Sequence, residues 1–218
     1  MQAKAYKGLG MEGLIARWYA TTTRKDLSEF RALARRMAEG LPEGANVLEV
    51  APGPGYFAIE LAKLGNYHVT GVDISKTFVE IARKNAAIEG VQVDFRQGNA
   101  ASMPFGEGSF DLILCRAAFK NFSEPVTALK EMRRVLRPGG KAVIIDLRKD
   151  APKEAIDSYI DNLGVNTLNA LFMKWAFRSM LLKRAYTREQ FERFIARNGF
   201  QNARIEETSV GFEISLIK

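Results

Sequence analysis

The sequence predicts an α/β fold, a doubly wound and mostly parallel sheet with helices on both faces. Short apolar runs of strand length alternate with amphipathic runs of helix length from residue 46 to residue 147. The first apolar run leads directly into a glycine turn that opens a helix, and the second ends in a carboxylate, Asp73. Consecutive strands that are joined by helices pair in parallel through right-handed crossovers, so this order predicts one such sheet.

Five strands and five helices are expected up to residue 147. The strands cover 46–51, 67–73, 91–96, 110–115 and 141–147. The helices cover 11–20, 26–40, 56–64, 75–90 and 123–137. Asp26 followed by Glu29 is typical of a capping box, and Ser75 is placed to cap its helix. Ser123 is expected to cap the helix that follows it, with Pro125 early in the first turn.

The C-terminal part predicts an antiparallel addition to the sheet. Thr187 is expected to cap a last helix that stops at Asn198 and Gly199. Residues 203–208 and 211–217 are strand-like, and their short connection permits only antiparallel pairing. The sheet is therefore expected to have seven strands and to close with a terminal hairpin.

Length and composition indicate one domain, residues 1–218, with a helical cap at 1–40 and a helical lid at 150–186. The net charge of +7 is modest, and no apolar run approaches the ~20 residues that span a bilayer. The N-terminus lacks the apolar core of a secretory signal, so a cytoplasmic location is expected. A single cysteine, Cys115, and a single histidine, His68, exclude an internal disulfide and a cysteine- or histidine-rich metal centre.

The run 47–56 carries the strongest functional signal. Gly53 and Gly55 lack a Cβ atom, so the backbone can turn sharply and approach a ligand. Asp73 ends the next strand, 18 residues after Gly55. A carboxylate at that place accepts hydrogen bonds from ribose hydroxyls, which predicts an adenosine-containing cofactor.

Glu49 indicates which class of cofactor is expected. The pattern G-x-G-x-x-A that begins at Gly53 does not by itself separate nicotinamide enzymes from others. Glu49, however, lies inside the strand four residues before Gly53, where its carboxylate would face a positively charged cofactor rather than a pyrophosphate. A salt bridge from Glu49 to a neighbouring loop is the alternative interpretation.

Five motifs in order then resemble one family. They are the loop from Glu49 to Gly55, Asp73, and the segments 98–105, 110–112 and 136–140. With them the chain resembles the class I S-adenosylmethionine-dependent methyltransferases, of the small-molecule kind that includes the quinone methyltransferases. The resemblance implies a Rossmann-like fold, S-adenosyl-L-methionine as cofactor and a small-molecule acceptor. It implies cofactor contacts from Glu49, Ala51, Gly53, Gly55, Asp73, Ile74, Asn99, Ala100 and Cys115.

Two positions depart from the family pattern. Ala51 replaces the usual first glycine of the loop, so the loop must accept one methyl group there. Asn99 replaces the more usual aspartate in the segment that meets the adenine amino group. An asparagine still offers a carbonyl oxygen as an acceptor, so neither change removes the expected contact.

No catalytic residue is singled out by the sequence. Methyl transfer mainly needs alignment of donor and acceptor, and a base helps only some acceptors. Candidates near the site are Tyr19, Arg116, Lys120 and Asn121, and Arg116 with Lys120 could hold an anionic acceptor. His68 starts its strand, away from the strand tips where ligands bind. The Asn/Asp-Pro-Pro-Tyr motif of nucleic-acid and protein N-methyltransferases is absent after the fourth strand, so no nucleic acid partner is expected.

The many apolar residues of the segment 150–186 predict a lid and an apolar acceptor. The lid is expected to form one or two helices over the carboxyl ends of the fourth and fifth strands, with Phe172 or Trp175 facing an apolar or aromatic acceptor. Plain packing against the sheet edge is an alternative, and peripheral membrane contact through its basic residues is open but not favoured. Two other functions also stay open, a nicotinamide-dependent oxidoreductase and a non-catalytic module that binds the cofactor.

Overall fold

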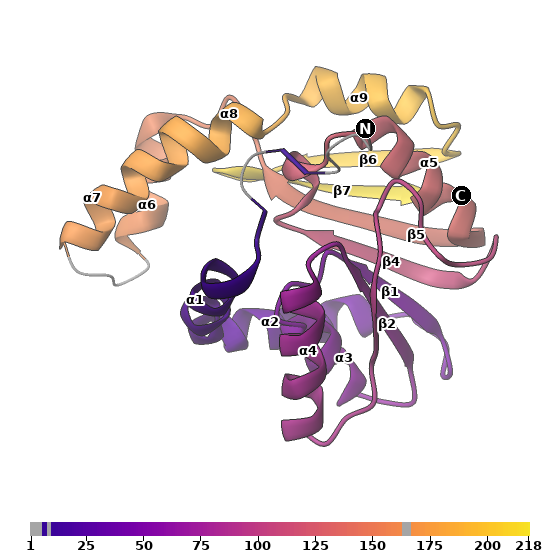
Figure 1. Ribbon diagram of the computed structural model, residues 1–218. Helices are drawn as coiled ribbons and strands as arrows, with labels where there is room; N and C mark the ends of the chain where they lie inside the picture. Colours follow the sequence, from indigo (N-terminus) through magenta and orange to yellow (C-terminus); the bar gives the residue numbers. More distant parts are fainter. Residues whose placement is uncertain (1–5, 8–9, 163–166) are drawn as a thin grey trace, which may run out of the picture.

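The structure, a computed structural model of the chain, describes residues 6–7, 10–162 and 167–218. Its centre is a seven-stranded sheet in the order β3-β2-β1-β4-β5-β7-β6 (Figure 1). The strands are β1 (Asn46–Val50), β2 (His68–Asp73), β3 (Asp94–Gln97), β4 (Phe110–Arg116), β5 (Leu136–Leu147), β6 (Asn202–Glu207) and β7 (Gly211–Ile217). The pairs among β1 to β5 are parallel, and β7 runs antiparallel to both β5 and β6. The predicted sheet with its antiparallel hairpin is therefore confirmed.

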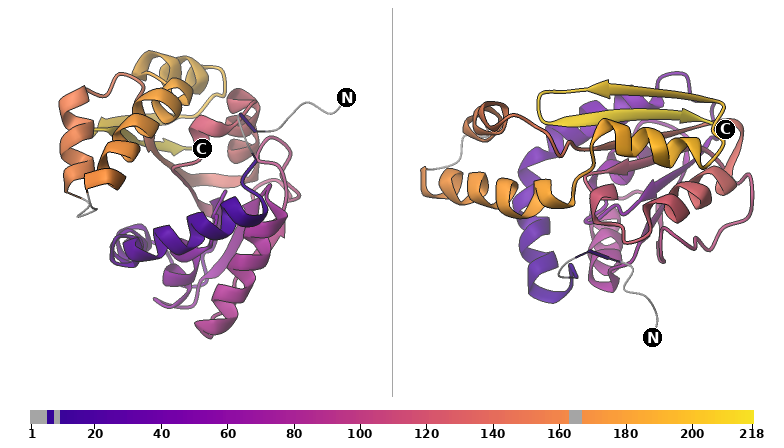
Figure 2. Two further views of the ribbon diagram at one scale, coloured as in Figure 1. Left: turned by 60° about the vertical axis from the view of Figure 1, so that its left-hand side comes forward. Right: turned by 90° about the horizontal axis from the view of Figure 1, so that it is seen from above.

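Helices cover both faces of this sheet (Figure 2). They are α1 (Gly13–Thr23), α2 (Leu27–Ala38), α3 (Tyr56–Ala62), α4 (Lys76–Ile88), α5 (Pro125–Val135), α6 (Lys153–Asp161), α7 (Thr167–Ala176), α8 (Leu182–Arg184) and α9 (Arg188–Ala196). The π-helical turn Phe177–Leu181 joins α7 to α8, and short 3-10 turns lie at Arg24–Asp26 and Phe119–Asn121. No helix within the described ranges is long and apolar enough to cross a membrane.

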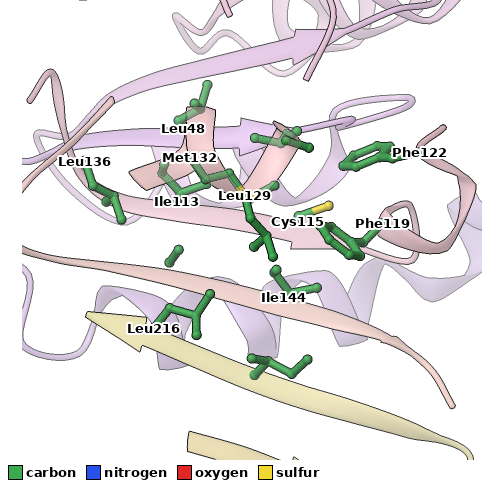
Figure 3. Packing of buried hydrophobic residues seen from close by; sticks show 14 of the residues in the cluster. Leu48, Ile113, Cys115, Phe119, Phe122, Leu129, Met132, Leu136, Ile144 and Leu216 are labelled. Carbon is green, nitrogen blue, oxygen red and sulfur yellow. The ribbon is translucent and has the colours of Figure 1, made fainter. Parts of the chain in front are cut away.

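The buried strand β4 shows how the sheet separates two cores. Ile113 and Cys115 pack into a cluster with residues of α5 and α9 (Figure 3). Leu112 and Leu114 point to the opposite face and pack with residues of α2 and α3. Successive side chains of a strand alternate between faces, so a strand covered on both sides reads as a continuous apolar run, as this one does.

The start of β5 differs from the prediction. Residues 136–140 were expected as a turn before a strand at 141, but β5 already begins at Leu136. Leu136 pairs with Phe110, and the register shifts before Leu112. The main chain of Lys218 bonds to Gly139 and Gly140, so tertiary pairing holds this glycine-rich stretch extended.

Two of the predicted helix caps are wrong. Asp26 makes no side-chain cap, because it is the last residue of a 3-10 turn that runs directly into α2. The N-cap of α5 is Glu124 rather than Ser123, also without a side-chain bond, although Pro125 does open the helix. Ser75 and Thr187 cap α4 and α9 as expected, and Thr187 forms a capping box with Gln190.

The described part of the segment 150–186 is helical, as expected. Residues 163–166 lie outside the described ranges. Helices α6 and α7 pack on each other through Ile156, Ile160 and Ala170. Both helices project beyond the carboxyl edge of the parallel strands, on the same side of the molecule as α1 (Figures 1 and 2).

Candidate active site

The glycine loop between β1 and α3 bends through three left-handed residues. Ala51, Gly53 and Gly55 have φ angles of 57°, 54° and 81°. A Cβ atom at Gly55 would lie 2.6 Å from the Phe95 ring and 3.0 Å from the Cβ atom of Ala82, so packing alone requires this glycine. A Cβ atom at Gly53 would meet nothing closer than Tyr19 Cε1 at 4.0 Å. The space beside Gly53 therefore suits a ligand that approaches the backbone.

The departure at Ala51 has a structural cost. Left-handed backbone is disfavoured for a residue with a Cβ atom by ~1–2 kcal/mol. The main-chain N–H of Ala51 donates to the Val72 carbonyl at 2.8 Å, which holds the residue in place beside β2. The loop does tolerate the methyl group, as the sequence required.

Asp73 links the end of β2 to the glycine loop. Its Oδ2 accepts a hydrogen bond from the Gly53 N–H at 3.0 Å, and its Oδ1 accepts one from the Ser75 N–H at 2.9 Å. Burial raises the pKa of Asp73 to about 6, against the opposing effect of these two bonds. A carboxylate offers about four acceptor sites, so the group can still accept a hydrogen bond from a diol.

Glu49 is a buried carboxylate without a cationic partner. Its Oε2 accepts one hydrogen bond, from the Ala58 N–H at 3.1 Å. No ion pair joins Glu49 to another described residue, so the structure does not support the alternative of a loop salt bridge. Burial raises the pKa of Glu49 to about 8, opposed by the Ala58 bond and by the charge of Arg116. A cation bound beside Glu49 would be favoured, because it would compensate a buried charge.

The other residues expected to contact the cofactor differ in how exposed their side chains are and in what they can offer to a ligand. Ile74 follows Asp73 with a partly exposed side chain, and Ala100 is half-buried. The Asn99 Oδ1 already accepts a hydrogen bond from the Ala101 N–H at 2.9 Å and has a second lone pair available. Cys115 has its thiol in the core beside Phe119 (Figure 3), so it can offer a ligand only its main chain.

Helix α1 covers the glycine loop from the N-terminal side. The ring of Tyr19 meets Phe78 of α4 edge-on, 5.8 Å between centroids, and approaches Gly53. The carboxylate of Glu12 accepts hydrogen bonds from the N–H groups of Lys76 and Thr77, at 3.0 and 3.1 Å. These bonds attach α1 to the N-terminus of α4. Burial raises the pKa of Tyr19, so its hydroxyl stays protonated at neutral pH.

Lys120 is not free to bind an acceptor, contrary to the expectation from the sequence. Its Nζ lies 2.8 Å from Asp146 Oδ1 and also donates to the Ala117 carbonyl, and both charged side chains are buried. A lysine that is paired in this way is not free to hold an anionic acceptor together with Arg116. The Asn121 Oδ1 is buried and accepts no hydrogen bond from the described residues, so this candidate keeps an open acceptor.

Arg116 extends from the end of β4 toward α2. One guanidinium nitrogen lies 3.1 Å from Glu29, and the guanidinium stacks on the Phe30 ring at 4.5 Å from its centroid. His68, by contrast, begins β2 at the opposite edge of the sheet. Of the four candidates that the sequence offered, Tyr19, Arg116 and Asn121 therefore stay available, and Lys120 does not.

Sequence reasoning missed Tyr159. It lines a cavity of about 310 Å³ together with Glu29, Ala155, Ser158, Asn162 and Ser209. Glu29, which forms the ion pair with Arg116, therefore lines the same cavity as Tyr159. Phe172 and Trp175, which were expected to face the acceptor, lie on the face of α7 away from α6 and are more than half exposed. Tyr159 of α6 is the aromatic lid residue that lines the cavity, and the sequence pattern carried no signal for it.

Comparison with known proteins agrees with this geometry. Residues 48–144 match the family described as methyltransferase domain. The chain is 31% identical over 191 residues to the demethylmenaquinone methyltransferase of Chlorobaculum parvum, covering 84% of this chain and 76% of that protein. It is also 36% identical over 108 residues to the ubiquinone/menaquinone biosynthesis C-methyltransferase of Bdellovibrio bacteriovorus, covering 49% of this chain and 46% of that protein.

A solved structure has the same fold over nearly the whole chain. It is a Methanococcus maripaludis protein assigned to the S-adenosylmethionine-dependent methyltransferases, with a TM-score of 0.78 and 21% identity, covering 99% of this chain and 97% of that one. The sequence match to the methyltransferase domain and to the Chlorobaculum methyltransferase decides against the nicotinamide-dependent alternative. The chain belongs to the class I S-adenosylmethionine-dependent methyltransferases.

Proposed function

We propose that this enzyme methylates a ring carbon of a small, largely apolar, hydroxylated aromatic acceptor of the quinol type. The cavity that Tyr159 lines carries the proposal, because its wall includes an aromatic side chain with a hydroxyl and also Glu29, the ion-pair partner of Arg116 at the end of β4. The relatives named as demethylmenaquinone and ubiquinone/menaquinone methyltransferases support this class of acceptor.

The residues around the glycine loop fit the cofactor. We assign the ribose to Asp73, the cationic amino-acid end to Glu49, and the adenine to Ile74, Asn99 and Ala100. The open space at Gly53 and the unpaired carboxylate of Glu49 support this arrangement. Ala51, Gly55 and the main chain of Cys115 complete the proposed set.

S-adenosylmethionine supplies the methyl group as a sulfonium electrophile. The protein holds the acceptor carbon in line with that methyl group and excludes water. When bound, the cofactor would give its methyl group to the ring carbon and keep the electron pair of the broken carbon–sulfur bond, and the ring proton would leave to water when the lid opens. Tyr19 and Tyr159 have pKa values raised by burial, so both hydroxyls are protonated and can donate to the acceptor oxygens.

We propose that residues 1–40 act as a cap and residues 150–186 as a lid for this site. The attachment of Glu12 to α4 and the position of Tyr159 support the two roles. Together the cap and the lid would enclose the acceptor, while the glycine loop between β1 and α3 holds the cofactor. A short-chain demethylnaphthoquinol tests the proposal directly, with the methylated atom of the product identified by mass spectrometry and NMR. Methylation of an oxygen, or no transfer to any quinol, would contradict it.

Asp73→Ala is expected to weaken S-adenosylmethionine binding by about 2–3 kcal/mol, because it removes a charged acceptor from the ribose. Calorimetry measures the change. The matched control is Asp111→Ala, since Asp111 also accepts a main-chain N–H, that of Asn46 at 2.7 Å, but at the opposite edge of the sheet. Equal affinities for the parent and Asp73→Ala would exclude the ribose role.

Tyr159→Phe is expected to lower kcat/KM for the quinol about tenfold, the effect of losing roughly one hydrogen bond. The dissociation constant of S-adenosylmethionine should stay unchanged, because Tyr159 lies on the lid. Steady-state kinetics with a soluble quinol measure the first quantity, and calorimetry measures the second. Tyr67→Phe, just before β2, serves as the control. Unchanged kinetics in Tyr159→Phe would place the acceptor elsewhere.

A further inference from the structure

Two helices at the carboxyl edge expose large apolar side chains. On α1, Leu14 is 84% exposed and Trp18 is 64% exposed. On α7, Leu171, Phe172 and Trp175 are 61%, 60% and 57% exposed. We call these five residues, with Ile15 and Met180, the apolar rim. Exposed apolar residues that cluster on one side of a protein mark a surface that another phase or partner covers.

The apolar rim has a consistent position in the fold. The buried residues of α1, Ala16 and Ala20, lie on the side of the helix opposite Leu14 and Trp18. Likewise Ala170 of α7 packs on α6, opposite Phe172 and Trp175. Both helices project from the carboxyl edge of the sheet, where the glycine loop lies (Figures 1 and 2). The rim therefore flanks the site from two sides.

The charge of the chain is concentrated in the same two segments. Residues 13–25 and 162–188 hold eight basic residues and no acidic one. The rest of the chain has 24 basic and 25 acidic residues, so its net charge is −1. The excess of basic residues over acidic ones in the sequence thus comes from the two segments that carry the apolar rim. Lys174, Arg178 and Arg188 form ion pairs, but no ion pair joins Arg17, Arg24, Lys25 or Lys183 to another residue in the described ranges.

We propose that the apolar rim is a docking surface for an anionic lipid bilayer. Tryptophan and other apolar side chains enter the interface between headgroups and acyl chains, while lysine and arginine attract anionic headgroups. The combination of both tryptophans with an acid-free basic sequence is complementary to such a surface. The inference rests on the proposed function for its purpose, because an apolar acceptor dissolved in a bilayer would reach the site where the rim docks.

The two tryptophans make the proposal directly measurable. Trp18 and Trp175 are the only tryptophans in the chain and both belong to the apolar rim. Tryptophan emission of the full-length protein should shift to shorter wavelength with vesicles of phosphatidylcholine and phosphatidylglycerol, and not with phosphatidylcholine alone. The shift should be reversed by salt, since exposed charges are screened. Trp18→Phe and Trp175→Phe each leave one reporter and show whether both helices enter the bilayer.

A matched pair of variants separates the rim from general hydrophobicity. Leu14→Glu should weaken binding to the anionic vesicles about tenfold or more, because it places a like charge and a polar group at the interface. Ile88→Glu, at a 65% exposed position on α4 outside the rim, should bind as the parent does. Co-sedimentation with the same vesicles measures the affinities.

Several results would overturn the docking surface. One is the absence of both the emission shift and co-sedimentation with anionic vesicles, and another is equal weakening by Leu14→Glu and Ile88→Glu. If the tryptophan emission shifts without lipid and the shift grows with protein concentration, a second copy of the chain covers the rim. If it shifts without lipid when the cofactor is added, the rim is covered by closure of the lid. Methyl transfer to a soluble quinol in lipid-free buffer separately tests the proposed function, so the two failures are distinguishable.

Discussion

Gly53→Val is expected to weaken S-adenosylmethionine binding about 100-fold or more, equivalent to about 3 kcal/mol, while the chain still folds. The reason is steric: the Cβ position meets no protein atom closer than 4.0 Å, so a valine side chain would fill the space assigned to the cofactor. The left-handed backbone, φ 54°, adds about 1–3 kcal/mol of strain to the folded state. Calorimetry and thermal unfolding measure the two effects separately.

Gly90→Val is the matched control for this experiment. Gly90 follows α4, has a φ angle of 68°, and a Cβ atom there would meet nothing within 4 Å. The same strain is therefore introduced away from the site. Both variants should lose similar stability, but only Gly53→Val should lose the cofactor. Similar cofactor affinities in the two variants would show that the space at Gly53 is not the binding site.

Cofactor affinity should rise about tenfold for each pH unit from about pH 6 to pH 8. Burial holds the pKa of Glu49 at about 8, so its carboxyl group is mostly protonated below that pH in the free protein. A cationic ligand favours the carboxylate, and binding then releases a proton. The complex holds fewer protons than the free protein, so affinity rises with pH until Glu49 is ionised. Below pH 6 the dependence should steepen, because Asp73 has a pKa of about 6.

Glu49→Gln should weaken binding at pH 8 and flatten this pH dependence, as calorimetry across the range would measure. It should also raise the melting temperature of the free protein at pH 8 more than at pH 5. The folded-state pKa of Glu49 lies above its ordinary value of 4.5, so ionising this group costs stability as pH rises through that interval.

Glu60→Gln is the control, because Glu60 is also buried but ionises readily. Burial alone would raise the pKa of Glu60, but hydrogen bonds from Lys63 and Arg31 lower it overall. Its replacement should leave the pH dependence of cofactor affinity as it is in the parent. A Glu49→Gln variant with the slope of the parent would refute the coupling between Glu49 and the cofactor.

The sequence predicted the sheet and the cofactor loop because both depend on local signals. A glycine that must adopt a left-handed conformation, a carboxylate at a strand end and an apolar run are each visible within a few residues. The pairing of Phe110 with Leu136 joins residues far apart in the sequence, so no local signal predicts it. Because of this pairing, the expected turn at 136–140 is instead the start of β5. Likewise, Asp26 has the right residue type for a cap, but the 3-10 turn that it ends determines its conformation.

The acceptor side of the site could not be predicted in the same way. Arg116 meets Glu29 across 87 residues of sequence, and Lys120 is neutralised by Asp146 on the neighbouring strand. Tyr159 reaches the cavity only because α6 packs where it does. Such contacts between distant segments set the properties of each candidate, and no spacing in the sequence encodes them.

The position of β7 has a consequence for the order in which the protein can fold. Strand β6 precedes β7 in the chain, yet it joins the sheet only through β7, which lies between β6 and β5. During synthesis, β6 therefore emerges without a partner, and the outer edge of β5 stays unpaired until β7 arrives. An open edge of this kind is a template for pairing with other chains. The interval between the emergence of β6 and the docking of β7 is thus the stage at which a nascent chain is most exposed to aggregation.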